Sequence, residues 1–257
     1  MDEAFELDER VIQRAMAPYP GVKEIVDFST PVVAFGNPNK SRVATLGINP
    51  SSSEFQIGNG NKTPLGGAIP KRLVDTEVLG INNPTSLTRE QAIKVIEGCY
   101  QYFYGQSPNP YEWFLKLEEF ILKPAGFTYY GQDATACHLD LVQWATDPVW
   151  DSIASKSTKE LLLKQDKEFL RYQLTSYNFE YVFLNGSTAV NQFKELGIAT
   201  LEQVHTVTAN SNGGRHTVVK GESGGTVFFG WGINTGAKYA SKAGLKELVE
   251  FIENSFK

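Results

Sequence analysis

The sequence predicts an α/β fold, with helices on both faces of a mainly parallel central sheet in a three-layer α/β/α arrangement. Apolar segments of strand length alternate along the chain with amphipathic segments of helical length. Several of the expected strands also end in polar residues, at the place where parallel α/β sheets bind their ligands. No linker composition divides the chain, so we expect residues 1–257 to form a single domain.

The first half of the chain begins with a helix expected over residues 7–17, because Pro18 and Pro20 stop it. Thr88 is a favourable N-cap for a second helix, since apolar residues then recur at helical spacing. Residues 56–87 are rich in Gly, Asn, Pro and Thr, which predicts a loop-rich insertion. The other elements expected in this half are strands at 31–36, 42–49 and 134–144 and a helix at 109–127.

The second half contains a clearly amphipathic segment at 157–174, which predicts a long helix capped by Ser157 or Thr158. A short apolar strand is expected at 179–186, and the helix after it ends at Gly197. The remaining expected elements are strands at 203–209, 214–221 and 224–234 and a last helix at 242–256.

The composition is that of an ordinary globular protein, with 41% hydrophobic and 21% charged residues. The sequence has no run of 18 apolar residues, so no membrane span is expected. The first residues, MDEAFELDER, are acidic and predict no targeting peptide. With only two cysteines, Cys99 and Cys137, we expect a cytoplasmic protein with free thiols.

The sequence also bears on metals, cofactors and charged partners. Two cysteines are too few for a cysteine-held zinc or iron–sulfur site, and the three histidines lack metal-binding spacing, so we expect no metal and no cofactor. The dinucleotide and zinc-protease motifs are missing from the sequence, and no nucleophile elbow is expected. The net charge of −5 disfavours non-specific binding to nucleic acid. A local basic face and scattered solvated cations both fit the cations near the Gly-rich segments: Lys62, Lys71, Arg72, Lys238 and Lys242.

Three of the expected strands end in unusual polar sequences: GINPS at 47–51, HLDLVQW at 138–144 and GINTG at 232–236. Together with YVFLNGSTAVNQF, they resemble the motifs of the uracil-DNA glycosylase superfamily. LGINPSSS is most similar to the G-I-N-P-G motif of the mismatch-specific branch. The resemblance is collinear and implies the fold described above, a DNA partner and hydrolysis of an N-glycosidic bond. The resemblance spans roughly residues 43–255. It does not cover the N-terminal extension at 1–40 or the insertion at 56–87.

The resemblance implies two catalytic residues. Asn49 is expected to position the attacking water, because an amide orients water but is not a strong base. Pro50 restricts Asn49 to an extended conformation and so holds its amide in place. Asn234 matches the first position of the second family motif, where a polar donor faces the departing base. The alternatives are a strand-ending turn at Asn49 and a helix-capping loop, with Ser241 as the cap, around Asn234.

The base that is excised is expected to be read by Asp140. In uracil-specific members an asparagine lies here, whereas a carboxylate only accepts and therefore suits the amino group of cytosine. Ser51 replaces the tyrosine that excludes substituents on C5 of the base. We therefore expect a 5-modified cytosine, hydroxymethylated or glucosylated as in phage DNA, and hence a role in antiviral defence. A simple ion pair with a lysine is the alternative for Asp140.

Further contacts follow from the same resemblance. Phe55 is the expected aromatic partner of the flipped base, and His138 shares a strand face with Asp140 and contacts the base or the backbone. Thr235 and the AKYAS segment depart from the family's wedge sequence, so the wedge is assigned to Lys238 or Tyr239. The expected DNA-binding residues are Ser52, Ser53, Lys238 and Tyr239.

The resemblance therefore implies a DNA glycosylase. No lysine stands in a recognisable Schiff-base position, so we expect a monofunctional enzyme without lyase activity. Two alternatives remain open. One is a repair glycosylase for uracil or mismatched thymine, and the other is a non-catalytic nucleic-acid-binding protein of the same fold.

Overall fold

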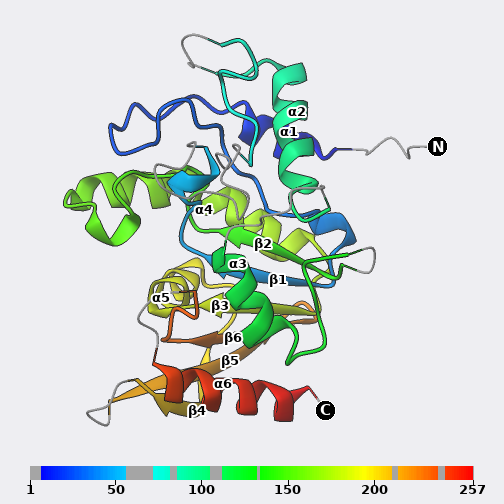
Figure 1. Ribbon diagram of the computed structural model, residues 1–257, viewed down its shortest axis with the longest axis vertical. Helices are drawn as coiled ribbons and strands as arrows, with labels where there is room; N and C mark the ends of the chain where they lie inside the picture. Colours follow the sequence, from blue (N-terminus) through cyan, green and yellow to red (C-terminus); the bar gives the residue numbers. More distant parts are fainter. Residues whose placement is uncertain are drawn as a thin grey trace, which may run out of the picture.

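The computed structural model contains a six-stranded sheet with the strand order β2-β1-β3-β6-β5-β4, flanked by helices (Figure 1). β2, β1, β3 and β6 are parallel, whereas β5 is antiparallel to both β6 and β4. The predicted three-layer α/β/α fold with a mainly parallel sheet is confirmed. The structure describes residues 7–55, 72–81, 86–104, 112–131, 134–209, 214–236 and 241–256.

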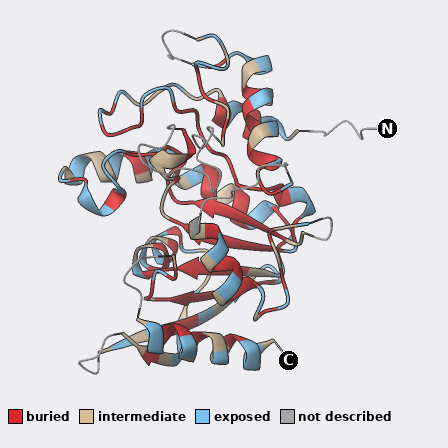
Figure 2. Ribbon diagram, viewed as in Figure 1, coloured by how far each residue is buried: buried red, intermediate tan, exposed pale blue. Residues whose placement is uncertain are grey.

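The strands differ in burial according to their place in the sheet (Figure 2). β1 and β2 are buried at every residue, which is typical of parallel strands that helices cover on both faces. β4, at the opposite edge of the sheet from β2, is exposed over its first four residues. The strands are β1 (Val43–Gly47), β2 (Ala136–Asp140), β3 (Tyr181–Asn185), β4 (Glu202–Thr208), β5 (Arg215–Ser223) and β6 (Thr226–Trp231).

Local capping signals explain where several helices begin and end. Thr88 caps α2 as predicted, through a reciprocal capping box with Gln91. Gly197 ends α5 in the left-handed conformation, with φ 62°. The predicted cap of α4 is wrong, because Ser155 accepts the hydrogen bond from the Thr158 N–H. The α-helices are α1 (Glu9–Ala15), α2 (Arg89–Tyr100), α3 (Glu112–Leu117), α4 (Lys156–Ser176), α5 (Ser187–Leu196) and α6 (Lys242–Ser255).

Shorter helical turns lie close to the strand ends. A π-helical turn (Glu118–Leu122) continues α3, and 3-10 turns occupy Pro38–Lys40, Ser52–Glu54 and Trp150–Ser152. Glu118 is buried in the π-helical turn, and its carboxylate accepts from the Thr128 hydroxyl and the Tyr129 N–H. This contact fixes the segment that carries Tyr129 beside the sheet.

Residues 31–36 differ from their prediction as a strand. They contribute one isolated antiparallel bridge, in which the backbones of Phe35 and His138 exchange two hydrogen bonds of 2.8 Å. The segment is buried mainly because its apolar side chains pack into the core against β2. Residues 56–71 and 82–85 of the expected insertion lie outside the described residues. No described helix has the length and apolar character needed to span a membrane.

Candidate functional site

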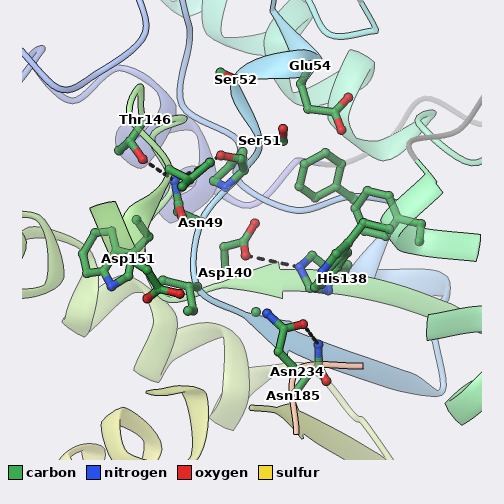
Figure 3. A pocket seen from close by; sticks show the side chains of 18 residues that line it. Asn49, Ser51, Ser52, Glu54, His138, Asp140, Thr146, Asp151, Asn185 and Asn234 are labelled. Atoms are coloured by element: carbon green, nitrogen blue, oxygen red, sulfur yellow. Dashed lines mark hydrogen bonds and ion pairs between the residues drawn. The ribbon is translucent and has the colours of Figure 1, made fainter. Parts of the chain in front are cut away.

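A cavity of about 210 Å³ lies at the carboxyl ends of the parallel strands. Gly47 and the residues after it line one side, and His138 and Asp140 contribute from β2. Asn185 at the end of β3 and Asn234 after β6 complete the polar wall (Figure 3). Drug-sized ligands fill cavities of ~300–1,000 Å³, so this one suits a smaller molecule.

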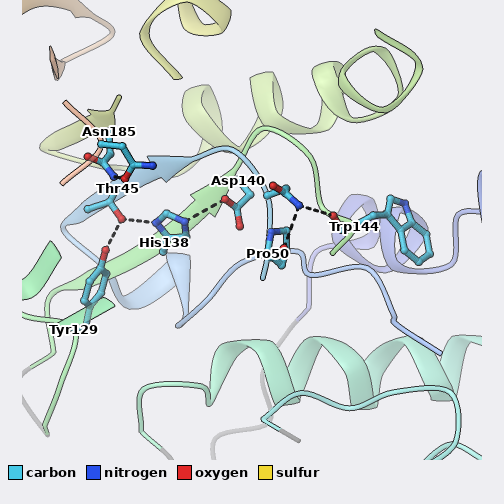
Figure 4. Close-up of polar contacts among 9 residues, drawn as sticks. Thr45, Pro50, Tyr129, His138, Asp140, Trp144 and Asn185 are labelled. Carbon is cyan, nitrogen blue, oxygen red and sulfur yellow. Dashed lines mark hydrogen bonds and ion pairs between the residues drawn. The ribbon is translucent and has the colours of Figure 1, made fainter. Parts of the chain in front are cut away.

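The amide of Asn49 has a defined orientation. Its nitrogen donates to the backbone oxygen of Pro50 at 3.1 Å, to the Thr146 hydroxyl at 3.0 Å and, more weakly, to the Trp144 oxygen at 3.4 Å (Figures 3 and 4). These acceptors determine which end of the amide is the nitrogen. Within the described part of the chain nothing donates to the Asn49 oxygen, which is therefore free to accept from water.

Asn234 is oriented in the opposite sense. Its side-chain oxygen accepts from the Gly236 N–H at 3.2 Å and from the Asn185 amide at 3.3 Å. A backbone N–H only donates, so the nitrogen of Asn234 is the end that remains available as a donor. The Asn185 oxygen in turn accepts from the Trp231 indole and from both the N–H and the hydroxyl of Thr235. Asn185 therefore connects β3 and β6 and holds Asn234 at the cavity.

A chain of buried polar groups leads to Asp140 (Figure 4). The Tyr129 hydroxyl contacts the Thr45 hydroxyl, which lies 2.6 Å from Nδ1 of His138. Nε2 of His138 is 3.2 Å from Oδ1 of Asp140. Since a carboxylate only accepts, Nε2 carries the proton, Nδ1 accepts from Thr45, and Thr45 accepts from Tyr129.

The Tyr129 hydroxyl, at the outer end of this chain, can act as the first donor. Burial raises the pKa of Tyr129 well above its ordinary value, so the phenol retains the proton that it donates. Among the described residues, His138 is the only side chain that hydrogen-bonds to Asp140, and it uses Oδ1. Oδ2 is therefore left as an acceptor at the cavity. This arrangement positions Asp140 to receive a hydrogen bond from a ligand.

Gly47 provides the space in which this pair lies. A Cβ atom at this position would be 2.8 Å from Oδ1 of Asp140 and 2.8 Å from Nε2 of His138. Such distances are shorter than van der Waals contact, and both side chains are buried. Glycine at the end of β1 is thus required by the two side chains of β2.

Aromatic rings form another part of the wall. Phe35, Trp113 and Phe114 line the cavity, and the rings of all three pack around the imidazole of His138 with centroid distances of 5.0–5.8 Å. Phe55, the aromatic predicted to contact the base, does not line the cavity. It is 3% exposed and belongs to the hydrophobic core, because the short turn after Pro50 directs it inward.

Glu54 is a cavity residue that the sequence analysis missed. It is 0% exposed, and both of its carboxyl oxygens lie 3.0 Å from the Tyr102 hydroxyl. Burial raises the pKa of Glu54 to about 7, although the nearby Arg72 guanidinium, 3.9 Å away, lowers it. The serines before it gave no sign that the fifth residue after Asn49 would turn back to the cavity.

The structure brings most of the expected site residues together. Asn49, Asp140, His138 and Asn234 line the cavity, as do Ser51 and Ser52. Ser53 is not part of its wall, since its N–H instead donates to the Ser51 hydroxyl within the turn. Lys238 and Tyr239 lie outside the described residues, as do Lys62 and Lys71. Val149, which no sequence signal indicated, lines the cavity and is 65% exposed.

Metal binding has no support among the described residues. Within the described ranges, no three His, Cys, Asp or Glu side chains are grouped so that they could hold a metal ion. Cys99 and Cys137 are buried free thiols, and burial raises the pKa of each to about 12.

The fold and the cavity define an α/β protein with a small cavity, lined by aromatic and polar side chains, at the carboxyl ends of its parallel strands. Comparison of the chain with protein-family models and with curated protein sequences gives no significant match.

Proposed function

We propose that the protein is a monofunctional DNA glycosylase that hydrolyses the N-glycosidic bond of a flipped 5-modified cytosine and leaves an abasic site. The observation that carries the proposal is the convergence of three polar groups with fixed and different roles. The Asn49 oxygen and Oδ2 of Asp140 are acceptors, whereas the Asn234 nitrogen is a donor. All three line one cavity that suits a single base.

The acceptor of Asn49 fits the attack of water. A water that donates to the Asn49 oxygen is held with a lone pair directed at C1′ of the sugar, which gains oxocarbenium character as the bond breaks. The water oxygen forms the new bond to C1′, and the electron pair of the broken bond leaves with the base. The proton of the water is lost to solvent, because an amide is not a base at neutral pH.

The donor of Asn234 fits the departing base. Negative charge develops on the base as the glycosidic bond lengthens, and a fixed N–H donor stabilises that charge. Asn185 and the Gly236 N–H set this orientation before any ligand binds, so little reorganisation is required. The Asn234 side chain is exposed, which leaves it accessible to a base that enters from DNA.

The acceptor of Asp140 fits a cytosine rather than a uracil. The exocyclic amino group of cytosine donates, whereas the carbonyl of uracil at the same ring position only accepts and would face the carboxylate unfavourably. The hydrogen-bond chain through His138 ends on Oδ1 and supports the acceptor state of Asp140. Ser51 lines the same cavity with a small side chain, which leaves room for a substituent on C5.

The size of the cavity bears on the substituent. A hydroxymethyl group adds little to a base, so hydroxymethylcytosine suits about 210 Å³. A glucose on the same hydroxyl would have to extend beyond the cavity. A base of this kind in foreign DNA would give the protein a role in antiviral defence.

A base-release assay tests the proposal. DNA that contains uracil, cytosine, 5-hydroxymethylcytosine or its glucosylated form is incubated with the protein, and abasic sites are scored by alkaline cleavage. We expect release of a modified cytosine, reduced at least ~100-fold in Asn49→Ala, which loses the positioned water. Asp140→Asn should lose modified cytosine and is expected to gain uracil. Asn191→Ala and Asp27→Asn, which alter exposed residues, serve as matched controls.

The other outcomes of the base-release assay would support one of the two alternative functions. Release of uracil or mismatched thymine alone would support a repair glycosylase and refute the role of Asp140. Binding of DNA with no release from any substrate would support a non-catalytic protein of this fold.

A further inference from the structure

Glu54 lies at the cavity without a role in the reaction described above. It ends the 3-10 turn Ser52–Glu54, and this turn forms a wall of the cavity together with Ser51. In Figure 3 this turn lies on the side opposite Asn185 and Asn234. The Glu54 side chain is 1% exposed, so any group that reaches it from the cavity is shielded from water.

Among the described residues, the partners of Glu54 leave its carboxyl group with unused hydrogen-bonding capacity. The Tyr102 hydroxyl has one proton, which the two carboxyl oxygens share at 3.0 Å. The guanidinium of Arg72 is 3.9 Å from Oε2, beyond the length of a hydrogen bond. A buried carboxyl group ordinarily has more partners than this, and an incompletely satisfied one at a cavity indicates a ligand contact.

The charged and titratable groups around Glu54 come from several elements. Tyr102 follows α2, Arg72 precedes the described turn at 76–80, and Asp140 ends β2. Asp140 raises the pKa of Glu54, and Glu54 contributes to the raised pKa of Tyr130. Burial, the largest cause, and the carboxyl group of Asp140 both raise the pKa of Glu54, which favours a neutral Glu54 that can donate as well as accept.

Ser51 is the cavity residue that precedes the turn carrying this carboxyl group. Ser51 and Glu54 line the same cavity and belong to the same short turn. A bulky side chain at position 51 would fill the space in front of the turn, whereas serine leaves it open. The space beside Ser51 therefore has a polar group at its end.

We propose that Glu54 determines specificity by binding a hydroxyl group on the C5 substituent of the base. This inference rests on the proposed function, since it assigns C5 of the flipped cytosine to the Ser51 side of the cavity. A hydroxyl both donates and accepts, and therefore satisfies a carboxyl group in either protonation state. A methyl group in the same place leaves the buried carboxyl group unsatisfied, which disfavours binding.

Binding of free bases tests this role without requiring any bond cleavage. Isothermal titration of the full-length protein with 5-hydroxymethylcytosine and with 5-methylcytosine gives the preference as a ratio of Kd values. We expect the wild-type protein to prefer the hydroxymethyl base at least about tenfold, because a buried polar site rejects an analogue that lacks its hydroxyl. Glu54→Gln, which keeps a donor and an acceptor, should retain the preference.

Two variants should remove the preference by different means. Glu54→Leu has no polar group, so the ratio of the two Kd values should fall to about one. Ser51→Tyr retains the Glu54 carboxyl group but fills the space in front of it and removes the Ser51 cap of the turn, and should also reduce the ratio to about one. Circular dichroism shows whether Glu54→Leu folds with a leucine beside Arg72. If it does not fold, Ser51→Tyr still tests the role of Glu54.

The outcomes separate this inference from the proposed function. A wild-type protein that binds both bases equally, or neither base, would overturn the role of Glu54. So would a folded Glu54→Leu or Ser51→Tyr variant that retains the preference. A preference that depends on Glu54 in a protein that releases no base from DNA would support the subsite and refute the glycosylase.

Discussion

The buried carboxyl group of Glu54 should make the stability of the protein depend on pH in a way that one substitution removes. Glu54→Gln keeps the size of the side chain and an acceptor for the Tyr102 hydroxyl, but it cannot ionise. At pH 5 the folded wild-type protein also has a neutral group at this position, so the two proteins should have similar stability. The free energies of unfolding of the two proteins should diverge as the pH rises.

The magnitude follows from the shift of the pKa of Glu54 from 4.5 to about 7 on folding. Because the folded-state pKa is raised, the unfolded chain releases this proton at lower pH than the folded protein does. Wild-type stability therefore falls as the pH rises from about 4.5 and levels off above about 7. At 1.36 kcal/mol for each pKa unit, the loss between pH 5 and pH 8 is about 2.5 kcal/mol.

Urea unfolding followed by far-UV circular dichroism at pH 5, 6, 7 and 8 measures this loss. The difference in unfolding free energy between Glu54→Gln and wild type should increase by about 2.5 kcal/mol over that range, in favour of the variant. Glu97→Gln makes the same chemical change at an exposed position of α2 and should remain within ~0.5 kcal/mol of wild type. A constant difference between Glu54→Gln and wild type from pH 5 to 8 would refute the raised pKa.

Three further predictions concern the rest of the site. Gly47→Ala should lower base release at least about tenfold, since its Cβ would lie 2.8 Å from Oδ1 of Asp140, and the loss should accompany a lower Tm. Thr146→Val removes one acceptor of the Asn49 amide and should lower kcat by about tenfold, with a smaller change in KM, in steady-state kinetics. Tyr129→Phe removes the outermost donor of the buried chain, so nitrogen-15 NMR should show a second imidazole tautomer beside the Nε2–H form.

Each of these predictions has an outcome that would contradict it. Full activity in Gly47→Ala would mean that Asp140 and His138 do not act from their observed positions. An equal rise in KM with constant kcat in Thr146→Val would assign Asn49 to binding instead of water positioning. A single unchanged tautomer in Tyr129→Phe would show that the phenol does not order the protons.

Much of the fold could be predicted from local sequence. Strand β1 lies inside the expected segment 42–49, and β3 inside 179–186, because continuous apolar residues of strand length have few other solutions in an α/β chain. The prediction of a strand at 31–36 was wrong, because it depended on the same signal, a continuous apolar segment of strand length. Its apolar residues are buried by packing against β2, and only Phe35 forms a bridge. Burial and strand pairing leave the same signal in the sequence.

The candidate site was predictable where its residues lie at strand ends, and not where tertiary contacts bring them in. Asn49 and Asp140 follow directly from the positions of β1 and β2. Glu54 and Trp113 reach the cavity through a short turn and through a separate helix, α3, whose placement no local pattern encodes. The prediction that Phe55 lies at the cavity was wrong by one residue, because the turn directs its neighbour Glu54 to the cavity instead.

The partners that orient Asn49 and Asn234 are largely main-chain atoms: the oxygens of Pro50 and Trp144 and the N–H of Gly236. Main-chain atoms are present whatever side chain a residue carries. Substitutions at other positions around the cavity can therefore accumulate over evolutionary time without turning either amide, provided that the path of the chain and the side chains of Thr146 and Asn185 are kept. A site that is oriented mainly by main-chain atoms constrains the neighbouring side chains only weakly. Two proteins of common origin can therefore keep such a site after their sequence similarity is lost.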